Sequence, residues 1–281
     1  MKHRAFGPTG TQVSVIGQGT WNMEKDDRQS AVASLRRGLE LGMNHIDTAE
    51  MYGDGKVEEI VGEAIAGRRD DVFLVSKVLP QNASRKGTIE ACERGLRHLR
   101  TDRLDCYLLH WEGPYPLADT FAAFEELRNA GKIRSWGVSN FDEEWLSDAL
   151  EIAGEGKVVC NQVLYHLQER AIEHAVIPFC EEHGIAVVAY SPFGSGEFPS
   201  PGSRGGRVLS EIAEAHGASP RQIALAFLVR RPFLFAIPKT SDPVHAKDNA
   251  AAADIDLSDE EVRRIDEAFP LGQRRKGVPT L

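Results

Sequence analysis

Hydrophobic and polar positions follow two alternating patterns along almost the whole chain. Short, largely apolar runs typical of buried strands alternate with longer segments whose apolar positions are three and four apart, as in amphipathic helices. The predicted strands are Val15–Thr20, Met43–Asp47, Val72–Lys77, Leu104–His110, Ile133–Ser139, Val158–Val163, Ala186–Tyr190 and Leu234–Ile237. The predicted helices are Arg28–Leu41, Lys56–Ala66, Arg85–Leu99, Leu117–Ala130, Asp142–Ala153, Ile172–His183 and Val208–His216, with two more that begin at the capping boxes of Ser219 and Ser258.

Repeated strand–helix units predict an α/β fold with a parallel sheet whose helices serve as crossovers. The eight units are evenly spaced, which favours a closed (β/α)8 TIM barrel over an open, doubly wound sheet. Residues Arg4–Val15, with Gly7-Pro8-Thr9-Gly10 at the bend, predict an N-terminal β-hairpin, and extra helices are expected near the C-terminus. We expect residues 1–281 to form a single barrel domain.

Charge and composition narrow the class of protein. The net charge is −9 and no long basic run is present, so we expect no nucleic-acid partner. No apolar run approaches the ~18 residues of a membrane span, and Met1–Gly10 has no apolar signal region. The four cysteines lack metal-ligand spacing and resemble core residues in a reducing compartment. These features predict a cytoplasmic protein with no bound metal, which we expect to be a monomer.

Polar residues stand at the ends of three predicted strands. Asp47, Lys77 and His110 end their strands, and Tyr52 follows Asp47 on a turn. In a barrel these ends meet at the face where active sites lie. A lysine there needs a partner such as Asp47 and could stabilise the phenolate of Tyr52, while His110 could hydrogen-bond a carbonyl oxygen. The set suits proton delivery during carbonyl reduction; the plainer interpretation is a lumen ion pair beside a core histidine.

Several ordered motifs resemble those of the aldo-keto reductases, in the type with a short C-terminal tail. They cover most of the chain and are Gly19-Thr20-Trp21, Ile46-Asp47-Thr48-Ala49 with Tyr52-Gly53, Ser76-Lys77, Leu109-His110-Trp111, Gly137-Val138-Ser139-Asn140-Phe141, Asn161-Gln162, Tyr190-Ser191-Pro192 and Ile237-Pro238-Lys239. The resemblance implies NAD(P)H-dependent reduction of aldehydes and ketones. It also implies a catalytic tetrad of Asp47, Tyr52, Lys77 and His110, with Tyr52 as the general acid.

No standard nucleotide motif explains the cofactor. Gly17-Gln18-Gly19 lacks the third glycine and the acidic residue of a Rossmann loop, and Gly194–Gly206 lacks the ending of a Walker motif. Barrels often bind phosphate in the loops after strands seven and eight. Here the first of these loops is Ser191, Pro192, Phe193, Gly194 and Ser195, and the second is Pro238-Lys239-Thr240-Ser241.

The resemblance assigns the cofactor contacts in more detail. It places Ser139, Asn140 and Gln162 at the nicotinamide amide, with Tyr190 stacked on the ring. It places Lys239 and Thr240 at the adenosine 2′-phosphate, with Asp248 and Asn249 near the adenine; Gly19, Thr20, Trp21 and Asp47 complete the expected cofactor contacts. One departure is His245, where many members carry an arginine that grips the phosphate. We expect NADPH as the cofactor, with NADH as the alternative.

Trp21, Tyr52 and Trp111 are expected to wall the substrate pocket. The short tail after Pro270 and the short Glu112–Pro116 loop predict an open, weakly selective site. Two rival functions stay open at this point. One is a class I aldolase that forms a Schiff base on Lys77, and the other is a cofactor-binding regulatory subunit with little turnover.

Overall fold

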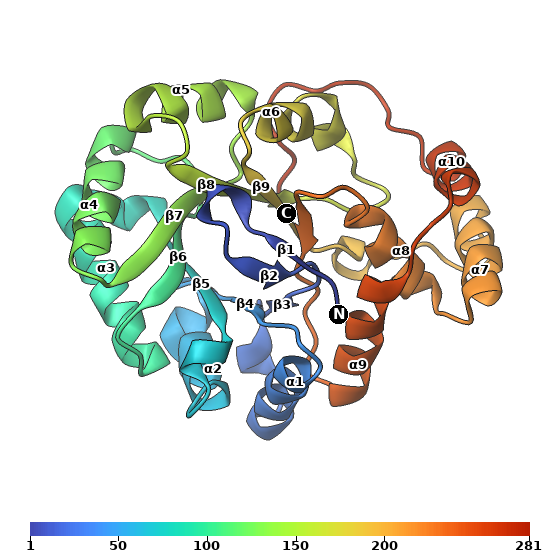
Figure 1. Ribbon diagram of the computed structural model, residues 1–281, viewed down its shortest axis with the longest axis horizontal. Coiled ribbons are helices and arrows are strands. Elements are labelled where there is room, and N and C mark those ends of the chain that lie inside the picture. Colours follow the sequence, from blue (N-terminus) through green and yellow to red (C-terminus); the bar gives the residue numbers. More distant parts are fainter.

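The computed structural model describes residues 1–281 and contains eight parallel strands surrounded by helices (Figure 1). The strands lie in the order in which they occur in the chain: β3 (Gln18–Gly19), β4 (His45–Asp47), β5 (Phe73–Val78), β6 (Leu104–Leu109), β7 (Ile133–Ser139), β8 (Val158–Leu164), β9 (Ala186–Tyr190) and β10 (Leu234–Ala236). Each pairs in parallel with the next, as repeated strand–helix units require.

The sheet closes between its first and last strands. Isolated parallel bridges join Ile16 to Ala236 and Gly19 to Lys239, and the Gly17 amide donates to the Ala236 carbonyl at 2.8 Å. A Cβ on Gly19 would lie 2.5 Å from the Ile237 carbonyl oxygen, so only glycine allows this close approach. The predicted (β/α)8 barrel is therefore confirmed, and the open doubly wound sheet is excluded.

The barrel lumen has its own apolar core, and an N-terminal hairpin supports it from below. The hairpin pairs β1 (His3–Ala5) with β2 (Gln12–Ser14), as expected from the sequence. Its Phe6 and Val13 pack with lumen residues that include Phe73, Val75, Cys106, Leu108, Val159, Val188 and Phe235. The alternation along β5 and β6 then carries Lys77 and His110 to the same inner side, at the opposite end of the barrel.

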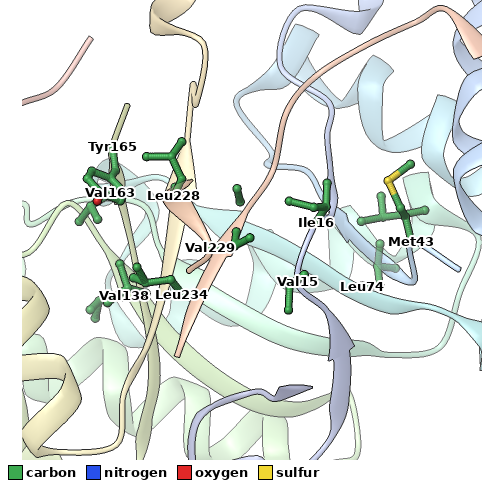
Figure 2. Packing of buried hydrophobic residues seen from close by; sticks show 14 of the residues in the cluster. Val15, Ile16, Met43, Leu74, Val138, Val163, Tyr165, Leu228, Val229 and Leu234 are labelled. Atoms are coloured by element: carbon green, nitrogen blue, oxygen red, sulfur yellow. The ribbon is translucent and has the colours of Figure 1, made fainter. Parts of the chain in front are cut away.

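A larger core fills the space between strands and helices (Figure 2). The helices are α1 (Arg28–Glu40), α2 (Lys56–Ala64), α3 (Arg85–Leu99), α4 (Leu117–Asn129), α5 (Glu143–Ala153), α6 (Val176–Glu182), α7 (Arg204–His216), α8 (Pro220–Leu228), α9 (Pro243–Ala251) and α10 (Asp259–Ala268). Both α7 and α8 lie between β9 and β10 in the chain, so extra helices near the C-terminus are confirmed. The capping boxes of Ser219 with Gln222 and of Ser258 with Glu261 are also present.

Two of the observed helices begin more than two residues away from their predicted first residue. The predicted helix Ile172–His183 is divided at Ala175, whose φ is −144°, and the α-helix begins only at Val176. The predicted helix Val208–His216 begins earlier, at Arg204, with Ser203 as its N-cap. All four cysteines are buried and unpaired, as expected of core residues. No helix is long and apolar enough to span a bilayer.

Candidate active site

Lys77 lies at the centre of the polar cluster at the carboxyl ends of the strands. Its Nζ donates to Asp47 Oδ1 at 2.5 Å and to the Thr48 carbonyl at 2.9 Å, and it lies 3.4 Å from the Tyr52 hydroxyl. Neither the Lys77 nor the Asp47 side chain is more than 1% exposed. Burial alone would lower the pKa of Lys77, but the charges and hydrogen bonds of Asp47 and Tyr52 outweigh it and raise this pKa above its ordinary value. The lysine is therefore held as a cation.

Tyr52 reaches the cluster from a tight turn after β4. Gly53, Asp54 and Gly55 all have positive φ, which turns the chain into α2 immediately after the tyrosine. Burial raises the pKa of Tyr52 above its ordinary value, and the positive charge of Lys77 acts in the opposite direction. The expected acidifying effect of Lys77 is present, but burial outweighs it. Tyr52 is thus protonated at neutral pH, and Lys77 is placed to stabilise the phenolate when the proton leaves.

His110 completes the group and is neutral. Burial, together with the charge of Lys77, holds the pKa of His110 well below its usual range. Its ring lies edge-on to Tyr52, with the ring centroids 6.1 Å apart. The Nδ1 atom is buried without a hydrogen-bond partner. A buried N–H without an acceptor is costly, so we assign the proton to Nε2, which can donate to a ligand in the cavity.

A cavity of about 560 Å³ opens above these residues. It is of the size and partly apolar character expected of a small-molecule site. Most of the residues expected at the cofactor and the substrate line it: Gly19, Thr20, Trp21, Asp47, Tyr52, His110, Trp111, Asn140, Gln162, Tyr190, Ser191 and Lys239. The structure thus brings together the strand ends and the predicted aromatic wall.

One wall of the cavity is formed by the amide side chains of Asn140 and Gln162 together with Tyr190. Gln162 Nε2 donates to Asp47 Oδ2 at 2.7 Å, which fixes this side chain. Asn140 is held by its own contacts, because its amide donates to the His110 carbonyl and accepts from the Tyr190 hydroxyl, both at 3.0 Å. Ser139 lies behind this wall, buried, and donates to the Gln162 carbonyl at 2.8 Å.

The other expected cofactor residues lie outside the cavity lining, on the two loops and the helix beyond it. Thr240 accepts a hydrogen bond from the Asp242 amide just before α9, and Asn249 is buried in α9. The Asp248 carbonyl accepts from Gln222, and the His245 side chain is 69% exposed. On the loop after β9, Phe193 packs edge-on against Phe198. The rest of that loop, which is Pro192, Gly194 and Ser195, follows Ser191 next to the cavity.

Sequence reasoning missed several residues that line the cavity. Trp145 on α5 is 37% exposed and borders the cavity with Met51. The C-terminal tail also reaches the site, through Gly277, Val278, Thr280 and Leu281. The short tail therefore forms part of the cavity wall, while the open and weakly selective character of the site stays a prediction.

Asp26 also went unpredicted. Its carboxylate pairs with Lys239 and accepts from Ser241 Oγ at 2.7 Å. This ion pair joins the loop before α1 to the loop after β10. Lys239, expected at the 2′-phosphate, is therefore already engaged by an anion of the chain itself.

The carboxyl end of the barrel thus combines a buried lysine–aspartate pair, a tyrosine and a neutral histidine. This combination is typical of a barrel enzyme that uses acid–base catalysis. The model of the aldo/keto reductase family matches residues 15–269, and the chain belongs to that family. It is 46% identical over 257 residues to methylglyoxal reductase YeaE of Escherichia coli (strain K12), with 91% of this chain and 90% of that protein covered.

Two further comparisons agree with this assignment. The chain is 34% identical over 260 residues to the glyoxal reductase of Bacillus subtilis (strain 168), covering 92% of this chain and 89% of that protein. It also superimposes on the crystal structure of an aldo-keto reductase from Klebsiella pneumoniae in complex with NADPH. That match has a TM-score of 0.93 and 44% identity, and it covers 100% of this chain and 99% of that one.

Proposed function

We propose that this protein is an NADPH-dependent carbonyl reductase that converts aldehydes and ketones to alcohols. The observation that carries the proposal is the contact of Lys77 Nζ with both Asp47 and Tyr52 at the floor of the cavity. A protonated tyrosine beside a buried cation can release its proton to an oxygen that is gaining electrons. We further propose that the protein acts as a single-domain monomer in the cytoplasm.

Each residue of the cluster has a separate role in this proposal. Tyr52 protonates the carbonyl oxygen, and Lys77 stabilises the phenolate that results. Asp47 holds Lys77 in place, while His110 donates from Nε2 to the same oxygen and orients the substrate. Trp21 and Trp111 border the space left for the substrate.

The cofactor would be held along the opposite wall. Gln162, with Ser139 and Asn140, would bind the amide, and Tyr190 would stack on the ring. Lys239, Thr240 and the loop of Ser191–Ser195 would bind phosphate groups, with Asp248 and Asn249 near the adenine. When bound, the nicotinamide supplies the hydride for the carbonyl carbon. The proposal favours NADPH because the structurally similar Klebsiella enzyme binds it.

Small neutral dicarbonyls are the first substrates to test. Two relatives of the chain are a methylglyoxal reductase and a glyoxal reductase. The cavity agrees with this class, since Glu112 and Asp142 line it and would repel an anionic substrate.

The decisive experiment follows the oxidation of NADPH and of NADH in the presence of aldehydes, ketones and dicarbonyls. Turnover with NADPH that falls by about 10²-fold or more in Tyr52→Phe, with cofactor affinity retained, is the expected result. Full turnover in Tyr52→Phe would refute the assigned role. NADPH binding without turnover on any carbonyl would instead support the regulatory subunit.

The aldolase interpretation is disfavoured by the state of Lys77. Schiff-base formation needs a neutral amine, whereas Asp47 and Tyr52 raise the pKa of Lys77 and keep it charged. Borohydride treatment in the presence of a carbonyl substrate should therefore leave Lys77 unmodified.

A further inference from the structure

Glu50 lies between Asp47 and Tyr52 on the turn after β4. Its side chain is only 8% exposed. The carboxylate accepts three hydrogen bonds: from the Leu79 backbone amide at 2.6 Å, from Asn82 Nδ2 at 3.1 Å and from Arg94 Nη2 at 2.6 Å. A carboxylate has about four lone-pair positions that can accept hydrogen bonds, so a buried carboxylate is stabilised by several donors. The arginine among these donors also compensates the negative charge of Glu50.

The partners of Glu50 determine what it connects. Leu79 lies two residues after Lys77, just beyond the end of β5, and Arg94 is on α3. The backbone of the same turn is also joined to β5, since the Thr48 amide donates to the Val75 carbonyl at 2.9 Å. The Glu50 amide reaches the Lys77 carbonyl at a longer 3.3 Å. The side chain of Glu50 therefore anchors the turn that carries Tyr52 to the strand end that carries Lys77.

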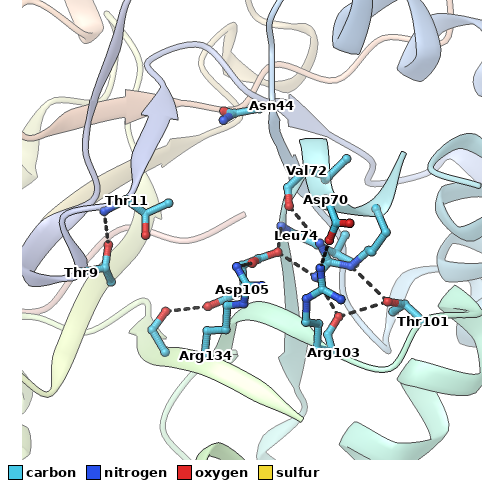
Figure 3. Close-up of polar contacts among 12 residues, drawn as sticks. Thr9, Thr11, Asn44, Asp70, Val72, Leu74, Thr101, Arg103, Asp105 and Arg134 are labelled. Carbon is cyan, nitrogen blue, oxygen red and sulfur yellow. Dashed lines mark hydrogen bonds and ion pairs between the residues drawn. The ribbon is translucent and has the colours of Figure 1, made fainter. Parts of the chain in front are cut away.

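A similar arrangement exists at the other end of β5 (Figure 3). Asp105 on β6 is 6% exposed and accepts from the Leu74 backbone amide at 2.9 Å. It pairs with Arg69 at 2.7 Å and with the exposed Arg134 at 3.3 Å. At each end of the strand a buried carboxylate thus pairs with arginine and accepts a backbone amide, that of Leu74 within β5 or that of Leu79 immediately after it. Only the Glu50 end is adjacent to the cavity, whereas the Asp105 end lies at the base of the barrel, where such contacts serve stability.

We propose that Glu50 is a positioning residue for catalysis, which through Leu79 and Arg94 keeps the Tyr52 hydroxyl within reach of Lys77 Nζ. The proposal rests on the proposed function, because it gives Tyr52 the role of proton donor. The Tyr52–Lys77 contact is 3.4 Å, long for a hydrogen bond, so a small displacement of the turn would break it. Misplacement of a reacting group by about 1 Å can cost 10²-fold in rate.

The test compares matched variants at the two ends of β5. Glu50→Gln and Arg94→Ala alter the upper site, and Asp105→Asn and Arg134→Ala alter the lower one. For each full-length variant we would measure the melting temperature and the affinity for NADPH. We would also measure kcat for the reduction of a carbonyl substrate and the solvent isotope effect on kcat.

We expect all four variants to bind NADPH with unchanged affinity, and the two carboxylate variants to lose comparable stability. Only Glu50→Gln and Arg94→Ala should lower kcat, by about 10- to 100-fold, with a larger solvent isotope effect because proton transfer becomes slower. Their alkaline limit of activity should move to higher pH, since Lys77 would no longer lower the pKa of Tyr52.

Two results would overturn the proposal. The first is a kcat within about two-fold of the parent in both upper variants, and the second is an equal loss of kcat in the lower variants. If Glu50→Gln does not fold, Arg94→Ala decides alone, because this arginine is 43% exposed and its removal is compatible with a folded chain. Absence of turnover in the parent would refute the proposed function itself and is distinguishable from either result.

Discussion

Lys77 and Asp47 form an ion pair at 2.5 Å that is almost completely removed from solvent. Breaking a buried pair by removing one partner leaves the other charge without compensation, at a cost of about 3–5 kcal/mol. Lys77→Met should therefore lower the free energy of unfolding by about that amount and abolish turnover. Urea denaturation and the NADPH assay measure the two effects.

The double variant Lys77→Met with Asp47→Asn is the control for that prediction. It removes both charges, so it should regain part of the stability while remaining inactive. A single Lys77→Met variant as stable as the parent would show that the pair contributes nothing to folding.

The pH dependence of reduction should follow Tyr52 and His110. Tyr52 must be protonated to donate, and burial raises its pKa above the ordinary value of about 10. His110 stays neutral even at pH values below the usual pKa of histidine, because burial lowers the pKa of His110. We expect kcat for reduction to be flat from about pH 6.5 to about pH 10 and to fall above it. A decline of kcat centred near pH 8 would mean that the charge of Lys77 has a larger effect on the pKa of Tyr52 than burial has.

His45 predicts an acid-sensitive component of stability that is separate from catalysis. It is fully buried against Phe6 and Phe73, and both ring nitrogens lack partners. Burial lowers the pKa of His45 to about 3. Because the unfolded chain binds the proton near pH 6.5, stability is complete above that pH and is lost progressively as the pH falls toward 3.

Replacement of His45 by leucine should remove this loss. At pH 5 the loss corresponds to about 2 kcal/mol, so the parent and His45→Leu should differ more at pH 5 than at pH 7.5. Thermal unfolding of both proteins at the two pH values measures this difference in stability. Parallel pH dependence in both proteins would contradict the assignment.

The sequence predicts the elements with strong periodicity and the residues at strand ends. Strands Ile133–Ser139 and Ala186–Tyr190 and helix Arg85–Leu99 have the bounds that were expected. The cluster around Lys77 was predictable because parallel strands bring their carboxyl ends to one face of a barrel.

The misplaced helix boundaries have local reasons. Gly205 and Gly206 open α7 although glycine disfavours helices, because a Cβ on Gly205 would lie 2.3 Å from the Phe269 ring and one on Gly206 would lie 1.9 Å from the Ser200 carbonyl oxygen. Close packing outweighs propensity there. Pro178 was the overlooked signal in the other case, since proline is tolerated only in the first turn and α6 begins at Val176.

The contacts made by Glu50, by Asp26 and by the tail could not be predicted in this way. Glu50 meets Arg94 on another helix, and Asp26 meets Lys239 across more than two hundred residues of chain. No periodic pattern encodes such pairs, because they depend on how separate loops come together after the barrel has closed.

The tail suggests a test of substrate selection. Arg275 pairs with Glu169 at 3.3 Å and Arg274 pairs with Glu143, so that Val278 and Leu281 border the cavity. Deletion of residues 277–281 should raise the KM of small carbonyls about 10-fold, which corresponds to about 1.4 kcal/mol of lost apolar contact. Bulky aldehydes should be affected less, because they regain contacts elsewhere. Arg274→Ala should have a smaller effect in the same direction, and an unchanged KM after deletion would exclude the tail from the substrate site.

Cofactor preference provides a last prediction, at His245. This side chain is 69% exposed on α9 and lies 3.9 Å from Asp242, and a neutral imidazole binds phosphate weakly. His245→Arg should lower the KM for NADPH by about 3- to 10-fold and leave that for NADH unchanged, because only NADPH carries the 2′-phosphate that a guanidinium binds. The gain should shrink at high salt, as screening requires. His3→Arg, at an exposed position on β1, adds the same charge away from the cavity and serves as the control. Equal improvement with both cofactors would show that the arginine acts through general charge rather than through the 2′-phosphate.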